Sequence, residues 1–256
     1  MLDLLEVRLL AVDYKSKIDI RSDQALNYPM HLAAQTANLA IADILVSRDA
    51  HLNCRNAKYN TPIHTAASLN KPSFLSHFRN YERCHFKDTL SAKNFLQLTP
   101  LMCAAYNGHL ECVRELFAPG TMSLNDLLSL ENTDCDDRNV FHLCACQNQL
   151  ECFNFLMDHF PRDKDMVLFS RDKEENTVLH VAAKFGHLDF VQDVLDKVRA
   201  AGGGSMLKHL VLIKNSDEQT LLHLACLSQA SDEASKQFIK YILDKFDSHL
   251  FLLVLL

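Results

Sequence analysis

The sequence predicts an all-α fold, a solenoid of stacked helix-turn-helix units with long inter-repeat fingers. Three features recur along the 256 residues: a four-residue element that usually ends in His, a pair of small residues after it, and an apolar pattern with helical spacing. Self-similarity with a period of about 20 to 50 residues is typical of repeat architectures. The chain is 48% hydrophobic, which is enough for a continuous core.

The recurring element marks the start of the first helix of each unit. Its copies are YPMH at Tyr28, TPIH at Thr61, TPLM at Thr99, NVFH at Asn139, TVLH at Thr177 and TLLH at Thr220, at spacings of 33, 38, 40, 38 and 43 residues. Thr is a preferred N-cap, and a proline in the first turn removes an N–H that has no partner there. Those prolines are Pro29, Pro62 and Pro100. We therefore expect about six first helices, starting near residues 28, 61, 99, 139, 177 and 220.

The histidine of the element has the spacing to bond back to its own cap or to a neighbouring repeat, which is a structural role. It is found at His31, His64, His142, His180 and His223. Met102 replaces it in the third unit, Asn139 caps the fourth, and Tyr28 is a poor cap for the first. Because a lost cap costs about 1 kcal/mol, we expect these units to be locally weaker.

The rest of each unit predicts close packing, a tight turn and a second helix. The small pairs are Ala33 and Ala34, Ala66 and Ala67, Ala104 and Ala105, Cys144 and Ala145, Ala182 and Ala183, and Ala225 and Cys226. The turn positions are Gly108, Gly186, Asn70 and Asn148, residues that tolerate a left-handed backbone. Leu110, Val113 and Leu116 then define one face of a second helix. Residues 201–205, with three glycines, predict a flexible insertion.

TPLMCAAYNGHLECVRELF from Thr99 and TVLHVAAKFGHLDFVQDVL from Thr177 resemble ankyrin repeats, whose signature is T-P-L-H-x-A. The resemblance covers about residues 17–247. Residues 1–16 are similar to the second helix of a repeat whose start is missing, and residues 248–256 form an apolar tail. The resemblance implies a scaffold that binds a partner protein, of unknown identity, through its concave groove and fingers.

LLSLENTDCDDRN from Leu127 and MVLFSRDKEEN from Met166 are similar to the cytoplasmic repeats of ankyrin-type transient receptor potential channels, as is DRNVFHLCACQ from Asp137. This similarity implies an alternative function as the sensor arm of a cation channel, tethered to a membrane. A chain that begins inside a repeat and ends in FLLVLL from Phe251 fits that alternative.

Composition argues against several other classes of protein. A net charge of −6 without a basic face disfavours nucleic-acid binding. Nine cysteines, an odd number, and no secretory signal favour a reduced, cytoplasmic protein. The longest apolar run, residues 250–256, is far shorter than the roughly 20 residues that span a bilayer.

The sequence predicts no metal site, no cofactor and no enzyme activity. No CxxC pair meets a second one at a ligand spacing, and Cys144 and Cys146 point to different sides of their helix. Cys112 and Cys152 are expected to be buried apolar residues. The repeat pattern accounts for most candidate Ser, His and Asp residues, and residues 202–204 precede no phosphate-binding G-K-[ST] motif.

The candidate binding residues follow the small pair of each unit, where the first helix of an ankyrin stack faces its groove. They are Gln35, Ser68, Tyr106, Cys146, Lys184 with the adjacent Phe185, and, in the irregular last unit, Leu227. Tyr106, Lys184 and Phe185 are the best candidate anchors, because aromatic side chains dominate binding hot spots.

Overall fold

The computed structural model describes residues 25–79, 86–117, 123–228 and 232–245. The partial repeat expected at residues 1–16 and the apolar tail expected at 248–256 lie outside these residues. All regular elements in the described ranges are helices, so the all-α prediction is confirmed. The chain divides into two compact units, Met1–Leu127 and Leu128–Leu256, and each is described here by itself.

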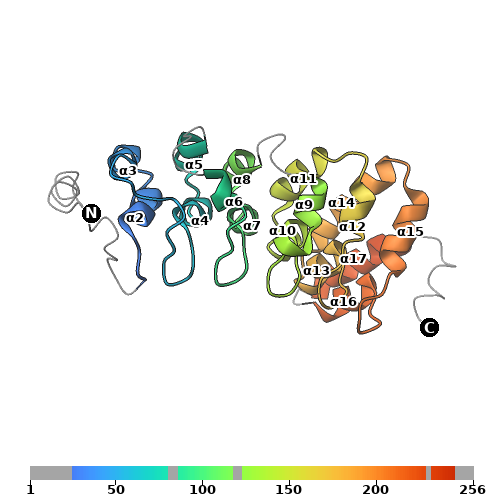
Figure 1. Cartoon of the computed structure of the whole chain (residues 1–256). Coiled ribbons are helices and arrows are strands. Elements are labelled where there is room, and N and C mark those ends of the chain that lie inside the picture. Colours follow the sequence, from blue (N-terminus) through green and yellow to red (C-terminus); the bar gives the residue numbers. More distant parts are fainter. Residues whose placement is uncertain (1–24, 80–85, 118–122, 229–231, 246–256) are drawn as a thin grey trace. The chain divides into compact units, whose positions relative to one another are not determined.

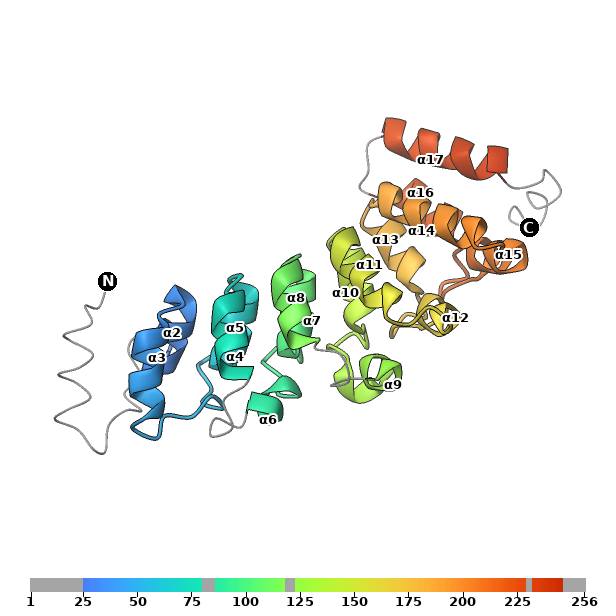
Figure 2. The ribbon, with the colours of Figure 1, turned by 90° about the horizontal axis from the view of Figure 1, so that it is seen from above.

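The first unit is built from three helix pairs in two layers (Figures 1 and 2). The first helices are α2 (Pro29–Thr36), α4 (Pro62–Ser68) and α7 (Pro100–Tyr106), and they pack side by side. The second helices are α3 (Leu39–Val46), α5 (Pro72–Arg79) and α8 (Leu110–Leu116), each packed on the first helix of its own pair. Each first helix begins at a proline. Proline fits this position because the N–H that it lacks would have no hydrogen-bond partner in the first turn.

The second unit repeats this arrangement (Figure 2). Its first helices are α10 (Val140–Cys146), α13 (Val178–Lys184) and α16 (Leu221–Leu227). Its second helices are α11 (Leu150–Asp158), α14 (Leu188–Ala200) and α17 (Asp232–Lys245). Phe153 of α11 lies between Phe141 and Phe190, at ring-centroid distances of 6.0 and 4.9 Å, and all three are buried. This aromatic row joins both layers of the unit into one core.

The extra residues between successive repeats fold as short helices. These are α6 (Phe86–Leu90), α9 (Leu124–Leu128), α12 (Lys164–Leu168) and α15 (Gly204–Leu212), and a short 3₁₀ turn, η2 (Leu130–Asn132), follows α9. Each helix buries apolar side chains, such as Val167 and Leu168 of α12. The hairpin fingers themselves stay short, so the added length lies in helices before the fingers.

The prediction of a flexible insertion at residues 201–205 is wrong. Gly202 has a φ of 81°, and the N–H of Gly203 bonds to the carbonyl of Val198 at 3.1 Å. This closes a tight corner between α14 and α15, which pack on each other. Leu207 and Leu210 of α15 are buried, so burial of this helix fixes the corner.

The predicted turn residues adopt the left-handed backbone. Gly108, Gly186, Asn70 and Asn148 have φ values of 73°, 79°, 54° and 55°. The first repeat uses Ala37 at the same place, with a φ of 53°. Its N–H and that of Asn38 bond to carbonyls at the end of α2, which offsets the strain of a left-handed alanine.

Among the residues described, none of the helices has both the length and the apolar character needed to span a bilayer.

Candidate functional site

Four of the motif histidines join their first helix to its own cap and to the next finger. In the second repeat the N–H of Thr61 donates to Nδ1 of His64 at 3.2 Å, and Nε2 of His64 lies 2.9 Å from the carbonyl of Leu98. A carbonyl only accepts, so Nε2 carries the hydrogen and Nδ1 accepts. The Thr61 hydroxyl, 2.9 Å from Nδ1, therefore donates to it. The expected structural role of these histidines is seen here directly.

Other repeats use the same arrangement. Nε2 of His31 and Nε2 of His180 lie 2.7 and 3.1 Å from the carbonyls of Asn60 and Ile213. Tyr28, the poor cap, still donates its N–H to Nδ1 of His31 at 3.2 Å. His223 is exposed, and in the described part of the chain its ring bonds only to its own cap, Thr220.

The fourth repeat departs from the pattern because Asn139 replaces threonine. Oδ1 of Asn139 accepts hydrogen bonds from the N–H groups of Phe141 and His142, as a good cap does. The same atom lies 2.8 Å from Nδ1 of His142, whose Nε2 faces the carbonyl of Asn176 at 3.2 Å. A neutral imidazole carries one hydrogen, so it can donate to only one of these two acceptors.

Burial keeps four of the motif histidines neutral. It lowers the pKa of His64, His142 and His180 to about 4, and it also lowers the pKa of His31. The backbone carbonyls that face Nε2 oppose this shift only in part. These histidines therefore stay neutral near pH 7 and serve as structural hydrogen-bonding groups.

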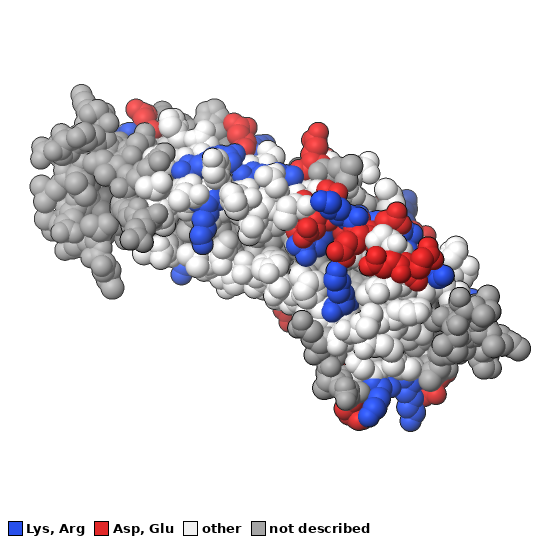
Figure 3. All heavy atoms as spheres, turned by 90° about the horizontal axis from the view of Figure 1, so that it is seen from below, with Lys and Arg blue, Asp and Glu red and all other residues white. Residues whose placement is uncertain are grey.

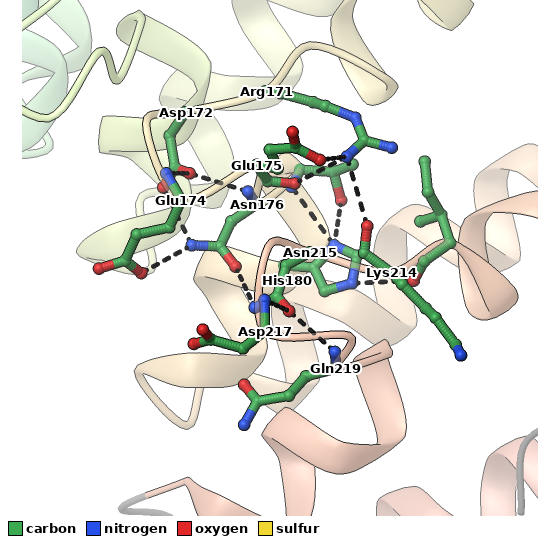
Figure 4. Close-up of polar contacts among 12 residues, drawn as sticks. Arg171, Asp172, Glu174, Glu175, Asn176, His180, Lys214, Asn215, Asp217 and Gln219 are labelled. Atoms are coloured by element: carbon green, nitrogen blue, oxygen red, sulfur yellow. Dashed lines mark hydrogen bonds and ion pairs between the residues drawn. The ribbon is translucent and has the colours of Figure 1, made fainter. Parts of the chain in front are cut away.

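Each finger is shaped by an Asn or Asp five residues before the helix cap. The side-chain oxygen accepts hydrogen bonds from the N–H groups two and four residues later, as Asn215 does from Asp217 and Gln219 (Figure 4). The five residues are Asn56, Asn94, Asp134, Asp172 and Asn215. The third residue after each has a left-handed φ of 57° to 62°, as at Tyr59 and Glu218. This repeating position is visible in the sequence, but the sequence analysis did not use it.

Successive fingers within a unit are bonded to each other. The N–H of Phe95 donates to the carbonyl of Lys58 at 2.9 Å in the first unit, and the N–H of Ser216 donates to that of Glu174 at 3.0 Å in the second. Side-chain amides add a second link, because Nδ2 of Asn94 donates to Oδ1 of Asn60 at 2.9 Å. The finger backbones within each unit therefore form a fixed frame.

The predicted groove residues differ in how much surface they present. Gln35, Lys184 and Leu227 are exposed, and Ser68 and Tyr106 are half-buried. The prediction that Cys146 lines the groove is wrong, because only 5% of its surface is exposed. Burial raises the pKa of the Cys146 thiol, and the charge of Arg138, at the base of the preceding finger, partly opposes that rise.

Lys184 is an ion-pair partner, since its Nζ contacts Oε2 of Glu174 on the preceding finger (Figure 4 shows the polar network of that finger). Leu227 of the predicted row is 69% exposed, and apolar side chains are also exposed at the residue that ends a first helix. Phe185 and Leu69, which cap the C-terminal ends of α13 and α4, are 42% and 46% exposed.

The fingertips of the two units differ in chemistry. In the first unit Tyr59, Phe95 and Leu96 are 55%, 72% and 55% exposed. In the second unit the tips carry carboxylates, and several of them are paired with bases of the same fingers, as Glu175 is with Arg171 at 2.8 Å. Figure 3 shows this side of the molecule, with mainly white and some blue spheres over the first unit and dense red and blue spheres over the second.

The described cysteines and acidic residues show no arrangement typical of a catalytic site. Burial raises the pKa of Cys103 to about 12 and of Cys152 to about 11, so their thiols stay protonated. Cys112 and Cys152 are buried, as predicted. Asp134, Cys135 and Asp136 offer three neighbouring ligand atoms, but Asp134 already accepts bonds from the Arg138 side chain and from two finger N–H groups.

Two further histidines have a role that the sequence analysis missed. Nε2 of His109 lies 3.1 Å from the carbonyl of Ser68, and Nε2 of His187 lies 3.0 Å from that of Cys146. Each follows the turn glycine of its repeat and reaches the end of the preceding first helix. The recurring Gly-His-Leu triplet, at Gly108 and Gly186, is the signal in the sequence that could have indicated this bond.

Comparison with known proteins gives relatives that share only part of the chain. A stretch of 137 residues is 28% identical to synphilin-1 of Mus musculus, covering 54% of this chain and 13% of that protein. A stretch of 143 residues is 26% identical to the ankyrin and armadillo repeat-containing protein of Mus musculus, covering 56% and 9%. A stretch of 81 residues is 35% identical to the E3 ubiquitin-protein ligase KEG of Arabidopsis thaliana, covering 32% and 5%.

This chain therefore spans only a small part of the length of these relatives. None of the three is a channel by name, and the similarity to transient receptor potential channels stays a prediction. A family model for ankyrin repeats, in three copies, matches residues 30–126, 63–166 and 120–201. Repeats of this family generally mediate contacts between proteins and are typically not enzymes. Together with the helix pairs, caps and fingers described above, this match, which covers more than half of the chain, shows that the protein belongs to the ankyrin-repeat family.

Proposed function

We propose that this protein is a scaffold that holds a partner protein through the concave groove and the fingers of its ankyrin repeats. The observation that carries the proposal is the repeated exposure of an apolar side chain where a first helix ends, at Leu69 and Phe185. Next to these positions lie Ser68 and Lys184 of the predicted groove row. An exposed apolar or aromatic side chain beside polar neighbours is the usual composition of a binding hot spot.

The test compares the proteins captured from a cell extract by the wild-type chain and by a groove variant. The groove variant combines Tyr106→Ala, Phe185→Ala and Lys184→Glu. A matched control carries Glu111→Gln and Glu151→Gln, two exposed residues on the second helices α8 and α11. We expect at least one partner to be lost with the groove variant and kept with the control. The groove proposal fails if every captured protein binds the groove variant as well as it binds wild type.

A further inference from the structure

Exposed apolar side chains gather on the fingers of the first unit. Three of the eight large hydrophobic residues that are exposed among the described residues lie there, namely Tyr59, Phe95 and Leu96. We call these three residues the apolar fingertips. Single exposed apolar residues are normal on a protein surface, whereas several on adjoining segments mark an interaction site.

The backbone holds the apolar fingertips in place. The N–H of Phe95 bonds to the carbonyl of Lys58, and the N–H of Leu96 bonds to Oδ1 of the buried Asn94 at 3.0 Å. Tyr59 lies in a tight turn, where its N–H bonds to the carbonyl of Asn56 at 2.9 Å. A partner that binds here meets side chains on an ordered frame, so less conformational entropy is lost on binding.

The charged side chains of the two fingers that carry the apolar fingertips all have one sign. Lys58 lies at a tip, and Arg55 reaches the carbonyl of Lys93 at 2.7 Å near the base of the next finger. Residues 53–60 and 92–98, which form the two fingers, contain no Asp or Glu. At the positions equivalent to Lys58 and Leu96, the second unit has acidic side chains. These are Asp136, Glu174 and Asp217.

We propose that the apolar fingertips bind an acidic segment of a partner protein, one in which an aromatic or aliphatic side chain is flanked by Asp or Glu. The proposal rests on the proposed function and adds the chemistry of the partner. Apolar side chains of the segment pack on Phe95 and Leu96, and its carboxylates lie close to Lys58 and Arg55. Complementary charge raises the association rate and excludes basic segments, which the same cations repel.

The test is selection from a random peptide display library on the full chain. Synthetic copies of the selected peptides are then titrated by fluorescence anisotropy. We expect Asp or Glu to be enriched beside Phe, Leu or Trp. The double variant Phe95→Ala with Leu96→Ala should weaken binding about tenfold or more, as loss of a hot spot does. Lys58→Glu should weaken it several-fold, and the effect should shrink at high salt.

The matched control is Ser216→Ala with Asp217→Ala, at the equivalent tip positions of the second unit. It should leave the affinity within about twofold of wild type, because surface changes away from a hot spot are near neutral. Peptides that lack acidic residues, or that bind the Phe95 and Leu96 variant unchanged, would overturn the proposal. If their binding depended instead on Tyr106 or Phe185, the groove function would stand and only this inference would fall. Failure to select any peptide counts against both. Binding of a labelled single-stranded RNA oligonucleotide that is lost in the Phe95 and Leu96 variant would show a nucleic-acid site and overturn the proposal.

Discussion

Oδ1 of Asn139 lies 2.8 Å from Nδ1 of His142, where the second and fifth repeats place a threonine hydroxyl. A hydroxyl accepts a bond and donates one, so Thr61 and Thr177 suit an imidazole whose Nδ1 accepts. An amide oxygen only accepts. His142 is completely buried, and the mismatch is a local cost that a single substitution can remove.

Asn139→Thr should therefore stabilise the protein. Threonine keeps an acceptor for the backbone N–H of the first turn and adds a donor for Nδ1 of His142. The bond from Nδ2 of Asn139 to the Ser170 hydroxyl is lost, but that hydroxyl keeps its bond to the carbonyl of Val167. We therefore expect the free energy of unfolding to rise by less than the ~1 kcal/mol that one hydrogen bond contributes. Urea unfolding followed by circular dichroism measures it. The reciprocal change, Thr177→Asn, should lower the free energy by a similar amount. A loss of stability in Asn139→Thr would contradict this explanation.

Mild acid should lower the free energy of unfolding. The loss should begin near pH 6.5, where histidines titrate and carboxylates are still ionised. The folded pKa values of His64, His142 and His180 are about 4, whereas the ordinary value is 6.5. Below pH 6.5 the unfolded chain binds protons that the folded chain does not, so stability falls as the pH drops from 6.5 towards 4. Three such groups give a slope of up to about 4 kcal/mol per pH unit. The slope is half of its maximum at pH 6.5 and fades about one pH unit above it, where the unfolded histidines are also neutral.

Urea midpoints measured between pH 7.5 and 5 test this expectation. His180→Met, which copies the residue that the third repeat has at Met102, removes one titrating group. It should lower stability at pH 7 because the bonds to Thr177 and Ile213 are lost. It should also make the pH slope shallower by about 1.4 kcal/mol per pH unit. An unchanged slope in this variant would show that the buried histidines do not control the acid sensitivity.

The parts of the fold that the sequence predicted well are those with a local chemical cause. Pro62 and Pro100 start helices because proline has no N–H to lose there, and Asn70 and Asn148 take the left-handed turn that their side chains tolerate. Ala37 takes the same turn without any such preference. The N–H groups of Ala37 and Asn38 bond to carbonyls at the end of α2 in that conformation, and the residue type at position 37 gives no sign of it.

The misses in the candidate site have tertiary causes. Cys146 follows the small pair exactly as Lys184 does, yet it is buried where Lys184 is exposed. Arg138, whose charge acts on the Cys146 thiol, lies on another element, so the pattern within the first helix gives no sign of this neighbour. The short helices between repeats were also not predicted, because five-residue segments such as α12 are too short to show a helical period.

Two neighbouring glycines at the corner between α14 and α15 look alike in the sequence but have different surroundings in the structure. A Cβ at Gly203 would lie 3.0 Å from Cγ1 of Val198 and 3.1 Å from its carbonyl oxygen, whereas a Cβ at Gly204 would meet no atom within 4 Å. We expect Gly203→Ala to destabilise by about 1 kcal/mol or more, from overpacking. Gly204→Ala should stabilise by about 0.5 kcal/mol, because alanine restricts the unfolded chain. Equal effects in thermal unfolding would mean that the corner is not closed as described.

Asn94 should be one of the most sensitive polar residues of the first unit. Its side-chain oxygen accepts the N–H groups of Leu96 and Leu98, both at 3.0 Å, and its amide donates to Asn60. Asn94→Ala leaves these groups without their partner, which should cost about 2 to 3 kcal/mol. Asn94→Asp keeps the acceptor and loses only the donor, as the aspartates of the second unit do, so it should cost less. Urea unfolding gives both values, and amide hydrogen exchange should show faster exchange at Leu98 in the alanine variant. If the two variants were equally unstable, the oxygen of Asn94 would not be what holds the finger, because the aspartate retains it.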